Sequence, residues 1–419
     1  MRKALLVVPV LVLVAAAIGL AAAAGEWNGK TVEIDGVPHF QNPAEPMLPL
    51  LTLEGKLLWS VGGDSEADEE LLGAIIEIAL DDEGNSYLLD TQLCEVKVFD
   101  PEGQFIHVIG QEGDGPGEFR RPTGLFYNKT AGLGVLQPMP ARIVMFNTAG
   151  EPTEELPVPG EGGFMSVSEI KNTGSYLLMA LTETAFNSGK MNIQGRLLLV
   201  SAGGQLIATV WDKNQTQSST SFSISSGTDE LMPVYQTGYN DLVYLSPHYD
   251  KYEIKVLDSQ AGTVRVISRE YETRQRSDEE IQEMKDRFER STAGMPAIKF
   301  TVQSADRDIQ EILVRDNGEI WVGSSRSLHE PDPGQFDIFE VFDPEGRYVR
   351  NVSVTARYDR ERDTVFLLKD RLYVVKEGLS SIRNAFSGMG MSSPAPDTEM
   401  DELQPPEVLC YQIGYVVAR

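Results

Sequence analysis

The four histidines are the first candidates for metal chemistry in this sequence. They are His39, His107, His248 and His329. A zinc ion in a protein is held by several His, Cys or carboxylate side chains that converge on one point. His107 falls inside a predicted outer strand, while His248 and His329 fall in loops of neighbouring repeat units with no evident third ligand. The sequence therefore predicts no metal site built on histidine.

Carboxylates are abundant, and calcium requires only oxygen ligands. An acidic run spans residues 64–70, and Asp332 precedes a Pro-Gly pair, but neither stretch has the ordered alternation of a calcium-binding loop. Glu77, Glu169 and Glu311 fall in segments expected to form the innermost strands. Glu77 and Glu311 stand at similar positions, shortly before a turn. Either these two side chains line a channel, or the similarity is a coincidence. We expect no cofactor, and calcium stays open without assigned ligands.

Nucleophilic chemistry has little support. No serine stands in a Gly-x-Ser-x-Gly elbow, and neither Cys94 nor Cys410 has a His or Asn close by in sequence. The two cysteines fall in the first and last repeat units, which are neighbours in a closed ring. We expect both thiols to be free, because strands of adjacent blades usually lie too far apart for a disulfide. The glycines at 110–117 do not form a dinucleotide site, since no helix follows them.

The elements that must position these residues are repeated β-strands. In residues 81–125, turns rich in Gly, Pro and Asp separate short apolar or alternating runs, which is typical of antiparallel strands. This pattern of turns and short strands recurs at 132–158, 173–211, 239–268, 317–354 and 369–419. An apolar segment precedes the first turn of every copy, at 74–80, 123–127, 165–170, 232–237, 309–314 and 364–368. Each of the six units therefore has four predicted strands, A to D.

Six such units packed around an axis bury the faces that one unit alone leaves exposed. We predict an all-β fold, a six-bladed β-propeller with four-stranded antiparallel blades. Residues 56–62 have the character of an outer strand and are expected to close the ring beside the sixth unit. Two stacked β-sandwich domains are the alternative, but they do not explain why the same pattern of turns and strands occurs six times. One inserted helix is expected near 277–290, and a flexible loop over 380–406.

Residues 1–24 resemble a secretory signal peptide, with a charged start, an apolar run and small residues at its end. A retained membrane anchor is the alternative. We expect residues 25–47 to form an N-terminal extension and 48–419 the propeller, without a further membrane span. The full chain has 36 Lys and Arg against 63 Asp and Glu, a formal charge of −27. This charge argues against nucleic acid as a partner, and we expect an exported monomer, periplasmic or extracellular.

The crossing at 109–125, IGQEGDGPGEFRRPTGL, together with NGEIWV and FDPEG, resembles the NHL-type repeats of bacterial secreted six-bladed β-propellers. The matching positions are Gly110, Gly113, Gly115, Gly117, Phe119 and Pro122. The resemblance covers residues 48–419 and implies the propeller fold. It implies little about function, because such propellers host many roles. Some propellers of this general shape are lactonases or amidating lyases that use calcium or zinc along the central channel.

We therefore expect a non-catalytic propeller that binds a protein, a small molecule or a carbohydrate. A metal-dependent hydrolase or lyase of the lactonase type is the alternative. The B–C and D–A connections hold the long segments, including 182–195 and 212–231, and they share one face of a propeller. Long loops of this kind are often functional. The candidate binding residues on that face are Asp90, Gln92, Arg120, Arg121, His248, Tyr249, Arg326 and His329.

Overall fold

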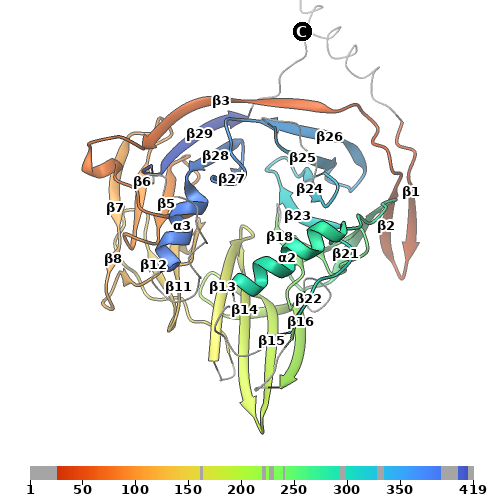
Figure 1. Ribbon diagram of the computed structural model, residues 1–419, viewed down its shortest axis with the longest axis horizontal. Coiled ribbons are helices and arrows are strands. Elements are labelled where there is room, and N and C mark those ends of the chain that lie inside the picture. Colours follow the sequence, from red (N-terminus) through yellow and green to blue (C-terminus); the bar gives the residue numbers. More distant parts are fainter. Residues whose placement is uncertain are drawn as a thin grey trace, which may run out of the picture.

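The protein is described by a computed structural model that covers residues 26–160, 164–218, 223–225, 231–238, 241–291, 299–327, 335–387 and 404–413. The predicted signal segment at 1–24 lies outside these residues. Within them, no helix has the length and apolar character needed to cross a membrane. The fold is mostly β, and its sheets are arranged in a ring, as Figure 1 shows.

Six blades, here numbered 1 to 6, follow one another along the chain, and blades 5 and 6 share one eight-stranded sheet. Their innermost strands are β4 (Ile75–Leu80), β10 (Gly124–Asn128), β13 (Phe164–Asn172), β18 (Val234–Thr237), β23 (Ile309–Val314) and β27 (Thr364–Leu368). The second strands are β5 (Ser86–Asp90), β11 (Gly132–Pro138), β14 (Tyr176–Asn187), β19 (Val243–Ser246), β24 (Ile320–Ser324) and β28 (Arg371–Lys376). The third strands are β6 (Glu95–Phe99), β12 (Ala141–Phe146), β15 (Lys190–Ser201), β20 (Glu253–Leu257), β25 (Gln335–Phe342) and β29 (Glu407–Ile413). The fourth strands are β7 (Phe105–Ile109), β16 (Leu206–Ser218), β21 (Thr263–Arg269), β26 (Tyr348–Thr355) and β3 (Leu51–Gly62).

In the described residues, the sheet of blade 2 has three strands, β10, β11 and β12. The chain after β12 runs beside it through an isolated bridge between Phe146 and Pro152. Backbone hydrogen bonds from Thr153 to Met145 and from Leu156 to Ile143 continue this contact. Proline at the bridge removes a backbone donor, which weakens a regular ladder at that point.

The apolar core consists of six clusters, and each joins two neighbouring blades. The cluster between blades 6 and 1 contains Tyr373 and Val408 from blade 6 together with Leu88 and Phe99 from blade 1. A strand such as β5 is buried along its whole length because neighbouring blades cover both of its faces, whereas the outer strand β7 is mostly exposed. The clusters therefore make the ring continuous, with no blade left open on one side.

Strand β3 closes the ring. Its second half pairs antiparallel with β29 of blade 6, from Gly55 with Ile413 to Gly62 with Glu407. The prediction that residues 56–62 supply the outer strand of the last blade is confirmed. The first half of β3 pairs in parallel with β26 of blade 5, so one strand ties two blades together.

The residues before β3 extend the sheet of blade 4 outward by two strands. Strand β2 (Val37–Asn42) pairs in parallel with β21, and β1 (Lys30–Ile34) pairs with β2. The buried Asn42 amide donates to the backbone oxygens of Ser268 (3.0 Å) and Gly346 (2.9 Å), which belong to blade 4 and blade 5. The segment expected to be an extension is thus paired with the propeller's sheets.

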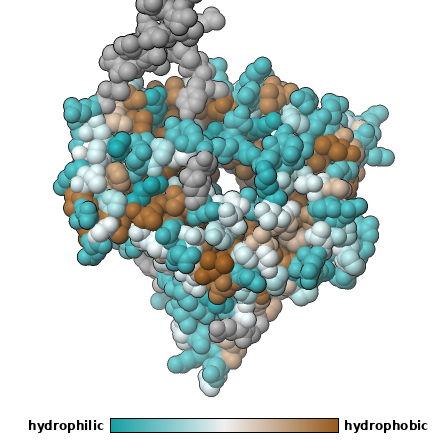
Figure 2. Space-filling model, turned by 180° about the vertical axis from the view of Figure 1, so that it is seen from behind, coloured by the Kyte–Doolittle hydropathy of each residue, from teal (hydrophilic) through white to brown (hydrophobic). Residues whose placement is uncertain are grey.

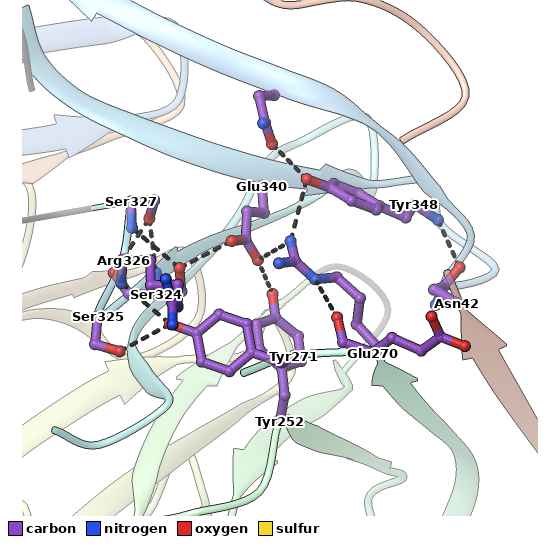
Figure 3. A network of polar contacts seen from close by, with 12 residues as sticks. Asn42, Tyr252, Glu270, Tyr271, Ser324, Ser325, Arg326, Ser327, Glu340 and Tyr348 are labelled. Carbon is purple, nitrogen blue, oxygen red and sulfur yellow. Dashed lines mark hydrogen bonds and ion pairs between the residues drawn. The ribbon is translucent and has the colours of Figure 1, made fainter. Parts of the chain in front are cut away.

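A buried polar network joins blades 4 and 5 (Figure 3). The Arg269 guanidinium lies 2.8 Å from Glu340 and within 4.9–5.3 Å of the ring centres of three tyrosines. The tyrosines are Tyr252, Tyr271 and Tyr348. The Glu340 carboxylate also accepts hydrogen bonds from the hydroxyls of Tyr252 (2.5 Å) and Ser324 (2.8 Å). The buried charges are therefore paired and hydrogen-bonded, as burial requires.

Two of the expected loops are regular structure. Residues 182–195 form the outer halves of β14 and β15, which pair continuously from Tyr176 with Ser201 to Asn187 with Lys190. They make a long hairpin that projects from the ring in Figure 1. Residues 212–218 are likewise strand, because β16 continues to Ser218. The prediction of loops was therefore wrong for residues 182–195 and 212–218.

Helices lie in two of the B–C and D–A connections. Helix α2 (Asp278–Ser291) is in the connection between blades 4 and 5, where the Ser277 hydroxyl and the Glu280 carboxylate cap its first turn reciprocally. Helix α3 (Gly378–Ser387) begins the B–C connection of blade 6, where a flexible loop was predicted. Both helices lie on the near face in Figure 1. Both cysteines are free and buried in inter-blade clusters.

Candidate functional site: the central channel

A cavity of about 520 Å³ lies between the innermost strands of all six blades. Its walls come from the second halves of these strands and from residues at the start of the A–B turns, such as Arg315 and Lys369. The cavity therefore opens toward the face that carries the short A–B turns, opposite to the face with helices α2 and α3. Figure 2 shows that far face, with an opening near the middle of the molecule.

Three glutamates hold equivalent positions in alternate blades. Glu77, Glu169 and Glu311 stand three residues before the ends of β4, β13 and β23. Each directly follows a shift of register in its strand, between Ile75 and Glu77, Val167 and Glu169, and Ile309 and Glu311. A β-bulge bends the strand and changes the direction of the next side chain. The same position in the other three blades is apolar, with Leu125, Val234 and Val365.

Glu169 is the glutamate with direct side-chain partners. Its Oε1 lies 2.5 Å from Lys171 Nζ, and its Oε2 accepts a hydrogen bond of 2.5 Å from the Tyr235 hydroxyl. The Lys171 ammonium is also 5.8 Å from the centre of the Tyr235 ring. Burial, together with the neighbouring Glu169 charge, raises the pKa of Tyr235, so the phenol stays protonated and remains a donor.

Glu77 and Glu311 are in a different situation. Burial raises the pKa of Glu77 to about 7; the Lys171 charge opposes this rise and the Glu169 charge adds to it. Burial raises the pKa of Glu311 as well, again opposed by Lys171. The backbone N–H of Ile78 has a smaller, opposing effect and lowers the pKa of Glu77. Among the residues that the structure describes, neither carboxylate has a side-chain hydrogen bond or ion pair within bonding distance.

The open end of the cavity carries charges of both signs. Arg315, Asp316 and Lys369 line it there. The Lys369 ammonium donates to the backbone oxygen of Asp81 at 3.0 Å, and the Arg315 guanidinium lies 4.9 Å from the centre of the Trp321 ring. The channel therefore has a mixed-charge rim and a carboxylate-rich interior.

The sequence-predicted site residues lie elsewhere. Asp90 is fully buried, and its carboxylate accepts hydrogen bonds from the backbone N–H groups of Gly73 (2.6 Å), Ala74, Gln92 and Leu93 (3.0 Å each). Its oxygens bind these backbone N–H groups, and the hydrogen bonds hold the residues before β4 against the turn after β5. Asp90 thus has a structural role.

Three other candidates are exposed near blade 1. The Gln92 side chain is solvent-exposed, and Arg121 is exposed with a backbone φ of 48°. Arg120 pairs with Glu112 (3.0 Å) and Asp114 (3.1 Å). Exposed pairs of this kind are worth little to stability.

The candidates around the turns of blades 4 and 5 are dispersed in the same way. His248 Nε2 lies 3.4 Å from Glu253, and Arg326 Nε donates to the backbone oxygen of Glu272 at 2.6 Å. His329 lies outside the described residues. The structure therefore does not bring His248 and Arg326 onto one ligand-sized cavity with the residues of blade 1.

Tyr249 lines a smaller cavity of about 290 Å³ on the face of the B–C and D–A connections. Arg276, Arg307 and Gln310 line it too. The Tyr249 hydroxyl donates to the backbone oxygen of Ala305 at 2.9 Å. Within the described part of the chain, no group of three or more His, Cys, Asp or Glu side chains is arranged to hold a metal ion.

Lys171 and Tyr235 were not foreseen from the sequence. Lys171 follows Glu169 by two residues, which places both side chains on the same face of strand β13. Lys171 falls one residue beyond the predicted innermost segment 165–170, whereas the strand itself continues to Asn172. Tyr235 had no signal in the sequence, because its contact with Glu169 is made between neighbouring blades.

Comparison with known proteins supports the fold. The family model DUF5128, described as a 6-bladed β-propeller, matches residues 66–273. The chain is similar to that family over those residues. No protein with curated annotation matches the chain in sequence.

Solved structures with a related architecture are distant. A Bacteroides fragilis protein whose name proposes export is 12% identical, with a TM-score of 0.45, and the match covers 87% of this chain and 99% of that one. Regucalcin from Agrobacterium tumefaciens, named as calcium-binding, is 12% identical with a TM-score of 0.38 and coverage of 87% and 96%. A gluconolactonase from Xanthomonas campestris is 11% identical with a TM-score of 0.37 and coverage of 82% and 87%. At these values the likenesses support no inference about function.

Proposed function

We propose that this protein is an exported, non-catalytic propeller that binds a small polar ligand in its central channel. The observation that carries the proposal is the cavity of about 520 Å³ bounded by all six blades, with Glu77, Glu169 and Lys171 in its wall. This volume is within the range of small-molecule sites, which combine apolar walls with a few well-placed polar groups. The proposed site lies on the axis and opens toward the A–B turns, rather than in the loops that the sequence favoured.

The frame around the channel favours binding by a preformed site. The innermost strands are held by inter-blade clusters on both sides and by the closing strand β3. The Glu169 carboxylate is fixed by Lys171 and Tyr235 before any ligand enters. Groups that are already ordered lose little entropy on binding, which favours affinity.

Thermal melting with a panel of small polar compounds tests this proposal. The panel holds organic acids, amines and sugars, and a compound that binds the folded protein raises the melting temperature. Ser168 is solvent-exposed and lines the cavity at the bulge of β13, so Ser168→Trp should narrow the channel, at the cost of the hydrogen bond from the Ser168 hydroxyl to the backbone oxygen of Ala180 (3.2 Å). Ser65 is exposed away from the lining, and Ser65→Trp is the matched control.

We expect at least one compound to raise the melting temperature of the wild type and of Ser65→Trp but not of Ser168→Trp. The double variant Arg121→Ala with Arg326→Ala tests the opposite face. If the shift disappears in that double variant and persists in Ser168→Trp, the binding site is on the face of the B–C and D–A connections.

A hydrolase or lyase is the second candidate function, and Glu77 is the residue that favours it. A carboxyl group with a pKa of about 7 is suited to proton transfer at neutral pH. If the compound that binds in the channel is converted to product, and Glu77→Gln abolishes turnover while binding remains, the protein is an enzyme. Unchanged compound after prolonged incubation supports the binding role.

A further inference from the structure

The smaller cavity, of about 290 Å³, lies between blades 4 and 5 and has a different character from the channel. Its wall includes Val234, the first residue of β18, and Gln310, the second residue of β23, so it lies at the ends of the inner strands opposite the A–B turns. Arg276 and Arg307 line it as well. The residues described in its wall include two arginines and no carboxylate. The wall is therefore locally positive, although the whole chain carries a formal charge of −27.

Arg276 is held in place by the chain around it. Its Nε donates to the Asp306 carboxylate at 2.8 Å, and its Nη1 donates to the backbone oxygen of Gln303 at 2.8 Å. Asp306 also pairs with Arg274, which in turn pairs with Glu280 in the first turn of helix α2 at 2.5 Å. The Asp306 carboxylate is therefore shared between two guanidinium groups, and the Arg276 side chain is largely buried with a fixed orientation.

Hydrogen-bonded backbone orders the segments that carry these side chains. Residues 274–276 and 304–306 pair through two backbone hydrogen bonds of 2.9 Å. The Tyr249 hydroxyl, from the B–C connection of blade 4, donates to the backbone of the second segment at 2.9 Å. Arg307 directly follows that segment, and its Nη2 donates to the backbone oxygen of Ser246 at 3.0 Å. Both guanidinium groups are thus positioned before a ligand enters, which lowers the entropy lost on binding.

Two guanidinium groups in one small wall fit a phosphate group best. A guanidinium presents its N–H donors in a planar fork that matches pairs of phosphate or carboxylate oxygens. A phosphate is tetrahedral and carries about 1.5 to 2 negative charges near pH 7, so it can accept from two guanidinium groups at once. A carboxylate carries one charge and two oxygens in a plane, which one fork already satisfies. The Gln310 amide supplies a further donor in the same wall.

We propose that this cavity binds one phosphate group through Arg276 and Arg307, as a second site apart from the ligand of the channel. The phosphate belongs either to free inorganic phosphate or to a small phosphate monoester, since both present the same group. The acidic surface of the chain opposes such a ligand only weakly, because at physiological ionic strength exposed charges farther than about 8 Å are largely screened. The two arginines of the wall act at contact distance and are screened much less.

Titration calorimetry of the full chain with inorganic phosphate tests the proposal. Glycerol 3-phosphate supplies a monoester, and succinate supplies two negative charges on carboxylates alone. The wall variants are Arg307→Gln and Gln310→Glu, and the control is Arg287→Gln, an exposed position of helix α2. Each of the three substitutions makes the formal charge more negative by the same amount, so only its location differs. Gln310 is exposed, so Gln310→Glu tests the site even if Arg307→Gln fails to fold.

We expect one phosphate per chain, bound about tenfold or more weaker in both wall variants and unchanged in Arg287→Gln. Tighter binding of glycerol 3-phosphate than of inorganic phosphate would identify a monoester as the ligand, and the reverse order would identify free phosphate. Ser168→Trp should leave phosphate binding unchanged, whereas its loss there would place the phosphate in the channel and overturn the proposal. Phosphate binding that is absent or indifferent to both wall substitutions also overturns it, and so does succinate binding more tightly than phosphate. None of these results bears on a channel ligand that Ser168→Trp excludes.

Discussion

Glu77 and Glu311 stand at the same position of two innermost strands, each directly after a β-bulge and three residues before its strand ends. They belong to blades 1 and 5, and blade 6 lies between them. Glu169 of blade 3 completes the set at the same position. A bulge in every second blade therefore places carboxylates around the channel at regular intervals, and the blades between them contribute apolar residues.

The raised pKa of Glu77 makes the stability of the protein depend on pH. Between its ordinary value of 4.5 and about 7, the folded protein binds more protons at Glu77 than the unfolded chain does. The free energy of unfolding therefore falls as the pH rises through this window. Glu77→Gln removes the effect. We expect it to be more stable than the wild type by about 1–3 kcal/mol at pH 8, and nearly equal at pH 4.5.

Urea unfolding at both pH values measures this difference. Glu102→Gln, in the exposed turn after β6, serves as control and should follow the wild type at both. A Glu77→Gln variant that is less stable than the wild type at pH 8 would mean that the ionised carboxylate has a stabilising partner.

Ring closure by β3 predicts a difference between two truncations. A chain that begins at residue 48 loses β1 and β2 but keeps β3, so it should fold with a lower melting temperature. A chain that begins at residue 63 loses the outer strand of blade 6 and exposes the edge of β29. We expect it to lose cooperative unfolding in calorimetry. An unchanged melting temperature for the chain from residue 63 would show that β3 is dispensable.

Gly110 shows why a glycine is needed at the first crossing between blades. It has a φ of 78°, and an added Cβ would overlap the ring of the buried Phe119. Gly110→Ala should therefore reduce the free energy of unfolding by about 2–4 kcal/mol. Gly36→Ala is the matched control, because Gly36 has a φ of 79° and no atom within 4 Å of the added carbon. Gly36→Ala should reduce the free energy of unfolding by only about 1 kcal/mol. If both substitutions reduce it equally, overlap with Phe119 does not explain the need for glycine at position 110.

The Arg269–Glu340 pair predicts strong coupling between blades 4 and 5 (Figure 3). Arg269→Met leaves the Glu340 charge buried without its cation and should cost about 3 kcal/mol. Adding Glu340→Leu removes that charge and should recover most of the loss. Denaturant unfolding of the two single variants and the double variant measures the coupling. If the losses in free energy of unfolding of the two single variants add up in the double variant, the two side chains act independently.

The repeat was readable from the sequence because its turns use specific chemistry. In Asp100–Gly103 the Asp100 carboxylate accepts backbone hydrogen bonds from Glu102 (3.0 Å) and Gln104 (2.8 Å), and Gly103 takes a φ of 83°. The same turn recurs at Asp343–Gly346. Such Asp and Gly positions stay visible when the strands between them diverge, so all six innermost strands were located from sequence.

The long hairpin of blade 3 was missed for a physical reason. Residues 182–195 are polar and look like a loop, but they extend β14 and β15 without a break. The positive φ angles at Ser188 (49°) and Gly189 (77°) form the tight turn that allows this pairing. The Ser-Gly pair was a usable signal, but the polarity of the flanking residues outweighed it.

The sequence predicted only some of the residues of the channel. Glu77 and Glu311 were noticed, but a bulge does not change composition or periodicity enough to be read from one chain. Its effect on side-chain direction appears only in the paired register. The contact of Tyr235 with Glu169 depends on how two blades pack, which no local pattern records.

The most direct test of the central claim is a crystal structure of the protein grown with the panel compound that raises its melting temperature most. The account predicts electron density for that compound inside the channel, in contact with Glu77 and beside the Glu169–Lys171 pair. Density for the compound on the face of helices α2 and α3, with the channel free of it, would contradict the account.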